Sequence, residues 1–387
     1  MTYLDETLVA ARELSRASRW PRALSLLDAA FGTVTGAASD LALDAPSDAS
    51  SDAALDAAAG PASNVDLDAI VSPASNVALD ATVSLAPDAA AGPAPGAAVS
   101  AASDAARDAA RGAATDDRAR IALAAAEVAL DSDWFAETAL AAARLTTADR
   151  LCAPSWDLDF LHLRHDYRAQ LHASGTAEFG PAGKDPAALE HLRDQAGSLA
   201  DRAPDRLRHG WARMYLGLIL DNLFADPEAA PFHYAAALEA GDARPIPEAR
   251  ETGQARAVRA DCAKGDDLPA REGRATRDDL PAHEGRATRD DLLAREALRH
   301  LGAHDRDRGD LATARARWER ATFLGARAGL VAGTLSQQLL LAVLSLETND
   351  EPGARRLAAE IARWSSAIGA PGLESQAESL LAADPVG

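Results

Sequence analysis

The chain has few of the residues that build an aromatic or cross-linked core. Aromatic residues make up 4% of its 387 residues, and the two cysteines are Cys152 and Cys262. These cysteines lie in unlike surroundings and form neither a disulfide framework nor a CxxC pair, which fits a reducing compartment. β-branched residues are sparse and no segment alternates with period two, which argues against a β-sheet core. The core therefore has to be built from leucine and alanine, so we expect an all-α protein.

Lysine is also scarce, and the 59 Asp and Glu residues outnumber the 39 Lys and Arg residues. The formal net charge is -20, and Lys184 and Lys264 are the only lysines. Such a charge repels the phosphates of nucleic acids and anionic lipids, so we expect neither nucleic acid nor a membrane as a partner. The first residues include Asp5 and Glu6 and no apolar leader, and the most apolar run, LSQQLLLAVLSL, is too short to span a bilayer. We therefore expect a cytoplasmic location.

Two stretches of low complexity interrupt the helical pattern. Residues 36–117 consist mainly of Ala, Asp, Ser, Pro and Gly, with a twelve-residue repeat that starts at Pro61 and again at Pro73. This composition buries too little area to offset chain entropy, so we expect a disordered insertion whose alanine-rich end has some helical tendency. Residues 251–292 also repeat every twelve residues and are highly charged, which predicts a solvated loop. Helical hairpins are expected in the remaining segments, 1–35, 118–250 and 293–387, the last of which ends in a capping helix.

Small residues are spaced as two touching helices require. A Leu-Gly pair precedes an alanine, an aromatic residue and a second alanine: Leu301, Gly302, Ala314, Trp318 and Ala321. Two helices cross closely only where side chains are small, while larger residues fill the spaces beside the contact. The polar Arg308–Asp310 segment between them predicts the turn. We therefore expect a tight helical hairpin here.

A similar spacing, with one extra residue in the turn, recurs earlier in the chain, at Leu216, Gly217, Ala230 and Tyr234. Together the two copies resemble the tetratricopeptide repeat, whose signature is a Leu-Gly pair, an alanine and an aromatic residue four positions on. Departures are Asp305, where an aromatic residue is expected, and the absent closing proline. A further copy near Ala124 has Glu127 where a large apolar residue is expected. The resemblance, to helical-repeat proteins of actinobacterial type, implies hairpins stacked as a right-handed superhelix with a groove lined by the first helices.

No pattern of catalytic or metal-binding residues is found. The chain lacks GxxxxGK[ST], a strand-linked GxGxxG, HExxH and GxSxG, so we expect no enzymatic activity and no cofactor. His162 and His165, with Asp166 adjacent, have the spacing of a metal-ligand pair. His300 and His304 also have such a spacing, but no third ligand can be assigned to them. A structural role is favoured for both pairs. Asp157 and Asp159 are interpreted as residues of a helix N-terminus, where the dipole favours acids.

Two functional classes remain open. In the first, the protein is a scaffold that captures a protein or peptide in the groove, with Arg213, Arg299 and Arg306 lining it and pairing with an acidic tail. The alternative for these arginines is a solvated helix face. In the second class, the array is a ligand-responsive regulatory or sensor module that acts through another protein. The sequence assigns neither the partner nor the oligomeric state.

Overall fold

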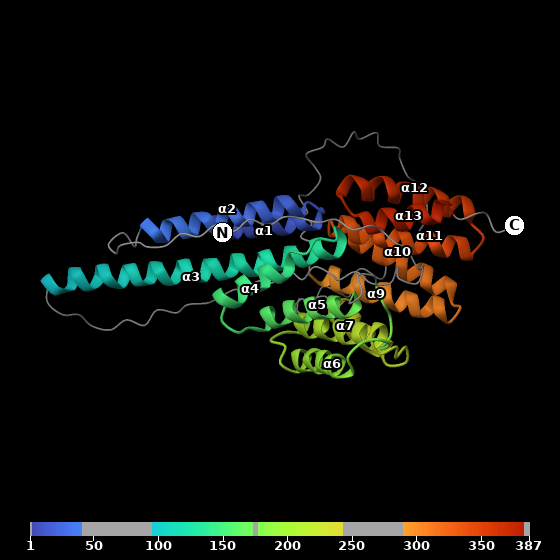
Figure 1. Cartoon of the computed structure of the whole chain (residues 1–387), viewed down its shortest axis with the longest axis horizontal. Helices are drawn as coiled ribbons and strands as arrows, with labels where there is room; N and C mark the ends of the chain where they lie inside the picture. Colours follow the sequence, from blue (N-terminus) through green and yellow to red (C-terminus); the bar gives the residue numbers. More distant parts are fainter. Residues whose placement is uncertain (1, 41–94, 173–176, 243–288, 383–387) are drawn as a thin grey trace, which may run out of the picture.

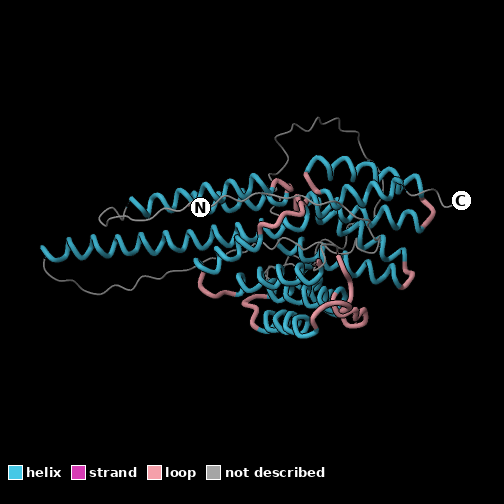
Figure 2. Tube along the Cα trace, in the orientation of Figure 1, coloured by secondary structure: helices cyan, strands magenta, loops and turns pink. Residues whose placement is uncertain are grey.

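The chain folds into helices, as its composition predicts. The computed structural model describes residues 2–40, 95–172, 177–242 and 289–382, and no strand occurs within them. Figures 1 and 2 show helices joined by short connections. None of these described helices has the length and apolar composition of a membrane span. The helices of the described residues are α1 (Tyr3–Arg16), α2 (Trp20–Asp40), α3 (Pro95–Phe135), α4 (Ala141–Leu151), α5 (Trp156–Leu171), α6 (Pro186–Asp201), α7 (Arg206–Asn222), α8 (Ala230–Asp242), α9 (Arg289–Asp307), α10 (Leu311–Arg327), α11 (Val331–Glu347), α12 (Glu351–Ile368) and α13 (Pro371–Ala382).

Similar turns connect the two helices of several hairpins. Each contains one residue with a positive φ: Ser18, Ala225, Gly309 or Asn349. The N–H of the residue that follows donates to a carbonyl in the preceding helix, a bond that commonly closes a helix C-terminus. Asp310 then caps α10 by accepting a hydrogen bond from the Thr313 N–H, and Asp350 caps α12 in the same way from Gly353. The Arg308–Asp310 segment is therefore a turn, as predicted.

The helices pack in chain order. Each helix contacts the next one, and the odd-numbered helices from α1 to α9 also contact one another in sequence. We call the odd-numbered helices, which follow one another through these contacts, the inner row, and the even-numbered helices the outer row. The two ends of the array meet, because α13 contacts α3 and the Ser18 hydroxyl accepts a hydrogen bond from the Ala332 N–H at 3.1 Å. One hydrophobic cluster accordingly contains side chains of α1–α3 together with side chains of α11–α13.

The small residues of the predicted hairpins lie at helix contacts. A Cβ added to Gly302 would lie 2.4 Å from the Nε1 of Trp318, and one added to Gly217 would lie 2.6 Å from the ring of Tyr234. The equivalent residues of the two hairpins thus make the same contact, between α9 and α10 and between α7 and α8. The small positions Ala230, Ala314 and Ala321 are fully buried, Leu301 is buried, and Leu216 is half-buried. The predicted spacing of close contacts is confirmed.

Three expected boundaries need correction. The insertion expected at 36–117 is wrong at both ends, because α2 continues to Asp40 and α3 starts at Pro95. Alanine is the strongest helix former, and the alanine-rich end joins the helix of residues 118–135 without a break. The loop expected at 251–292 is wrong at its C-terminal end, since α9 begins at Arg289. Residues 41–94 and 243–288, which hold most of both predictions, lie outside the described residues.

Candidate functional site

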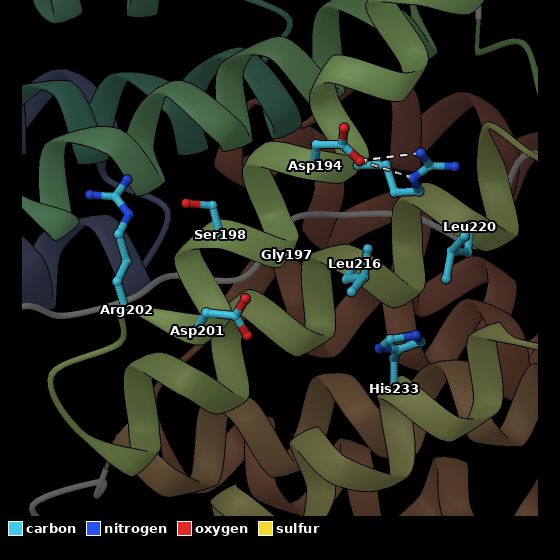
Figure 3. Close-up of a pocket in the computed structure, with 9 residues that line it drawn as sticks. Asp194, Gly197, Ser198, Asp201, Arg202, Leu216, Leu220 and His233 are labelled. Atoms are coloured by element: carbon cyan, nitrogen blue, oxygen red, sulfur yellow. Dashed lines mark hydrogen bonds and ion pairs between the residues drawn. The ribbon is translucent and has the colours of Figure 1, made fainter.

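An open groove runs between α6 and α8, with α7 as its floor. Its volume is about 700 Å³, and Figure 3 shows its side chains arriving from all three helices. The lining residues are Arg193, Asp194, Gly197, Ser198 and Asp201 of α6, its C-cap Arg202, Leu216 and Leu220 of α7, and His233 of α8. We call this feature the α6–α8 groove.

The helical period explains how the α6–α8 groove is lined. Asp194, Gly197 and Asp201 follow one another at intervals of three and four residues, so they share one face of α6. Leu216 and Leu220 are one turn apart on α7 and form an apolar floor. A Cβ added to Gly197 would meet no atom within 4 Å, so this wall of the groove is open. The groove therefore combines an apolar floor with a charged rim.

An exposed aromatic residue lies beside the groove. Phe232 of α8 is 70% exposed, and the Arg213 guanidinium lies over its ring, 5.3 Å from the centroid. Arg213 precedes Leu216 by three residues on α7, which puts it on the face that forms the floor. An exposed phenylalanine next to an arginine is typical of surfaces that bind proteins.

His233 contributes an imidazole that stays neutral. Burial lowers its pKa to about 4, and the positive charge of Arg213 lowers it in the same direction. In the unfolded chain a histidine titrates near 6.5. The unfolded state therefore takes up a proton over this interval while the folded state does not, so stability is lost as the pH falls from about 6.5 towards about 4.

A pH series tests this assignment. We expect the wild type to lose about 1 kcal/mol more unfolding free energy than the His233→Gln variant between about pH 7 and pH 5, with allowance for the partial exposure of the ring. Urea unfolding at each pH measures the difference. The matched control is His191→Gln on the exposed face of α6, which should follow the wild type. Parallel pH profiles for wild type and His233→Gln would contradict the neutral assignment.

Polar contacts also link the helices of the inner row. The buried Asp131 of α3 accepts hydrogen bonds from Ser15 of α1 and from Arg164 of α5, both at 3.0 Å. Between α5 and α7, the Asn222 amide donates to the Tyr167 hydroxyl at 2.6 Å. These contacts join four odd-numbered helices in chain order.

The links continue to the last hairpins. Asp221 of α7 lies 3.1 Å from the His304 ring nitrogen of α9 and accepts a hydrogen bond from the Tyr234 hydroxyl at 3.0 Å. Arg295 of α9 donates to the Gly333 carbonyl of α11 at 2.7 Å. Polar side chains thus connect each consecutive pair of odd-numbered helices from α1 to α11.

Burial changes the acid–base behaviour of this inner row. It raises the pKa of Asp131 to about 7, against the opposing effect of Arg164. For Glu296 burial also acts to raise the pKa, but the charge of Arg295 and its neighbours outweighs burial and lowers it to about 2. Burial lowers the pKa of Arg299 to about 9. Charged groups of both signs are therefore held in surroundings that disfavour charge.

The structure does not bring the three predicted partner-binding arginines to one surface. Arg213 is half-buried beside the α6–α8 groove, as described above. The outward position expected for Arg299 is wrong, because its side chain is fully buried where α8 and α10 cover α9. Arg306, near the end of α9, is half-buried and pairs with Glu347 of α11. Only Arg213 thus adjoins the groove.

The histidine and aspartate pairs have structural contacts. His162 lies 2.7 Å from Asp149, and His165 lies 3.2 Å from Asp166. The His300 ring stacks on Tyr234 with centroids 4.9 Å apart. Asp157 and Asp159 lie in the first turn of α5, as predicted. There Asp157 pairs with Arg208 and Asp159 pairs with Arg202, each at 2.6 Å.

Asp131 and Arg164 were missed by the sequence analysis. Their separation of 33 residues gives no local signal. A partial signal was present in Glu127 and Asp131, two acids one turn apart within an otherwise apolar helical run. Acids in such positions are buried only with partners, so they indicate an internal ion pair.

Neither a metal-binding group nor a similar known protein indicates a role for these residues. In the part of the chain that the structure describes, no group of three or more His, Cys, Asp or Glu side chains is arranged to hold a metal ion. Searches against protein-family models, curated proteins and solved structures return no match for this chain.

Proposed function

We propose that the protein is a non-enzymatic helical-repeat module, similar to tetratricopeptide repeats, that binds a helical segment of another protein. In this proposal the hairpins form a right-handed superhelix, and the binding surface is the α6–α8 groove. The observation that carries the proposal is the apolar floor of Leu216 and Leu220 beside the charged wall of α6, in a groove of about 700 Å³. A groove of this kind accepts an amphipathic helix, which lays its apolar side chains along the floor.

The lining residues define the chemistry of the expected partner. Leu216 and Leu220 favour a helix with apolar residues at positions i and i+4, and the exposed ring of Phe232 extends the apolar contact. The cation Arg213 favours an acidic residue at a flank of that helix, since a guanidinium binds a carboxylate in a two-point geometry. The inner row supports this choice of surface, because the buried side chains of α9 leave no room for a peptide there.

Filling the groove tests the proposal. Gly197→Leu adds a side chain on the open wall of the groove, and leucine also favours a helix over glycine by up to about 1 kcal/mol. The variant should therefore stay folded and lose partner binding. The matched control is Gly32→Leu on α2, where an added Cβ likewise meets no atom within 4 Å. Tagged wild type and both variants are compared in affinity capture from a native cell extract.

The expected result is a set of proteins retained by the wild type and by Gly32→Leu but lost with Gly197→Leu. If Gly197→Leu retains the same proteins, binding does not use the groove. If no protein is specifically retained even by the wild type, the proposed function is wrong. Circular dichroism and thermal unfolding of all three proteins confirm that the comparison is made between folded chains.

A further inference from the structure

Most of the charged side chains that line the α6–α8 groove are already paired within the chain. Arg193 pairs with its neighbour Asp194 at 3.2 Å, and Arg202 pairs with Asp159 of α5 at 2.6 Å. The two members of such a pair carry opposite charges, so together they add little net charge to the groove. The charges of Arg193, Asp194 and Arg202 are thereby compensated.

Asp201 is the lining carboxylate that lacks such a partner. Among the residues that the structure describes, no ion pair and no side-chain hydrogen bond engages it. Its side chain is exposed and is directed across the groove towards Leu216 and His233, whereas Arg202 points away from them (Figure 3). A bound molecule can therefore reach an uncompensated negative charge on the α6 wall.

Arg213 supplies the opposite charge on the other side of the groove. No ion pair engages it within the described parts of the chain, and its guanidinium lies over the ring of Phe232 of α8, 5.3 Å from the centroid. Its charge also acts on His233, the α8 residue that lines the groove. The groove thus has a free negative charge on the α6 wall and a free positive charge beside α8, with the leucine floor between them.

We infer that the partner helix is basic on the flank that faces α6, where a lysine or arginine meets Asp201, and acidic on the flank that faces α8. The inference rests on the proposed function, helix binding in the groove, and adds the sign of the charge on each flank. A helix that is acidic on both flanks would place a carboxylate against Asp201, and this repulsion excludes it. The net charge of -20 acts in the same direction, because it attracts basic segments over a longer range.

Two synthetic helical peptides test the inference on the full chain. Both carry leucines at positions i and i+4 and glutamates along one flank. The other flank carries lysines in the first peptide and glutamates in the second. Calorimetry measures the affinity of each peptide at low and at high ionic strength. We expect the lysine peptide to bind about tenfold more tightly, and this preference to shrink at high ionic strength because salt screens an exposed ion pair.

Asp201→Lys separates the charge of the groove wall from the charge of the whole chain. The residue is exposed in the last turn of α6, where a cation suits the helix dipole, so the variant should fold. We expect it to bind the glutamate peptide more tightly than the lysine peptide. Asp116→Lys, at an exposed position of α3, makes the same change in net charge and should keep the wild-type preference.

The outcomes separate this inference from the proposed function. Equal affinity of the wild type for the two peptides, or a preference that Asp201→Lys leaves unchanged, would overturn the inference while helix binding in the groove stands. If neither peptide binds the wild type, the inference and the proposed function are both wrong. A preference that Asp201→Lys inverts and Asp116→Lys retains is the result that supports the inference.

Discussion

Replacing Gly302 by leucine is expected to lower the unfolding free energy by about 3 kcal/mol. The added Cβ alone would lie 2.4 Å from the Trp318 indole, and the rest of the side chain needs still more room. The indole cannot move aside freely, because it is 1% exposed and its N–H donates to the Arg299 carbonyl at 2.8 Å. Either α9 and α10 separate or Trp318 loses its hydrogen bond. Urea unfolding measures the loss.

The control uses the same substitution where space is open. Gly32→Leu on α2 should be neutral or stabilising, since leucine is the better helix former and its Cβ meets no atom within 4 Å. The contrast between the two variants isolates the helix contact from helix propensity. An equal effect of the two substitutions would mean that α9 and α10 do not touch at Gly302.

Replacing Asp131 by leucine is expected to cost about 3–5 kcal/mol near pH 8, where the carboxylate is ionised. The substitution leaves the Arg164 guanidinium, 1% exposed, without the acceptor that now lies 3.0 Å away. It also removes the hydrogen bond from Ser15, so α1, α3 and α5 lose their shared polar link. The loss follows from burying an uncompensated charge, and urea unfolding measures it.

Two comparisons make this result specific. Asp28→Leu removes an exposed partner of Arg144, an ion pair at 2.6 Å, and should cost at most about 1 kcal/mol. The double variant Asp131→Leu/Arg164→Met should recover most of the loss, because apolar side chains of similar volume replace the whole pair. A cost for Asp131→Leu no larger than that for Asp28→Leu would contradict the buried ion pair.

The hairpins could be predicted from the sequence because helix contacts require small residues at regular positions along the chain. Glycine and alanine must occupy the positions where backbones approach, so Gly302 and Trp318 could be paired from spacing alone. The start of α3 could not be predicted in this way. Its alanine-rich residues resemble the low-complexity stretch before them, and their helical state depends on continuity with the apolar residues up to Phe135.

The candidate sites were harder to predict, because burial is decided by neighbours that are distant in the chain. Arg299 lies on a helix rich in charged residues, and such a composition predicts a solvated helix face. The side chain of Arg299 is nevertheless buried, because α8 and α10 pack against α9. The α6–α8 groove depends on how α6 and α8 sit on either side of α7. Arg213 was predicted as a binding residue, but the roles of Gly197 and His233 as parts of one groove follow only from the packing.

The packing also divides the molecule into two kinds of surface. The inner row is closed by polar links such as Asp131–Arg164 and by the contact of the first and last hairpins through Ser18. The outer row leaves the α6–α8 groove open. In the account proposed above, the outer surface binds the partner, and the inner row sets the stability of the array that presents it.

Site-specific photo-crosslinking tests the central proposal, partner binding in the α6–α8 groove, most directly. A benzophenone side chain replaces Ser198 on the groove wall or, as the control, Thr146 on the exposed face of α4. The account predicts a crosslinked partner protein from Ser198 and none from Thr146, with the product lost when Gly197→Leu is added. Crosslinks from Thr146 alone, or none from either position in a native cell extract, would contradict it.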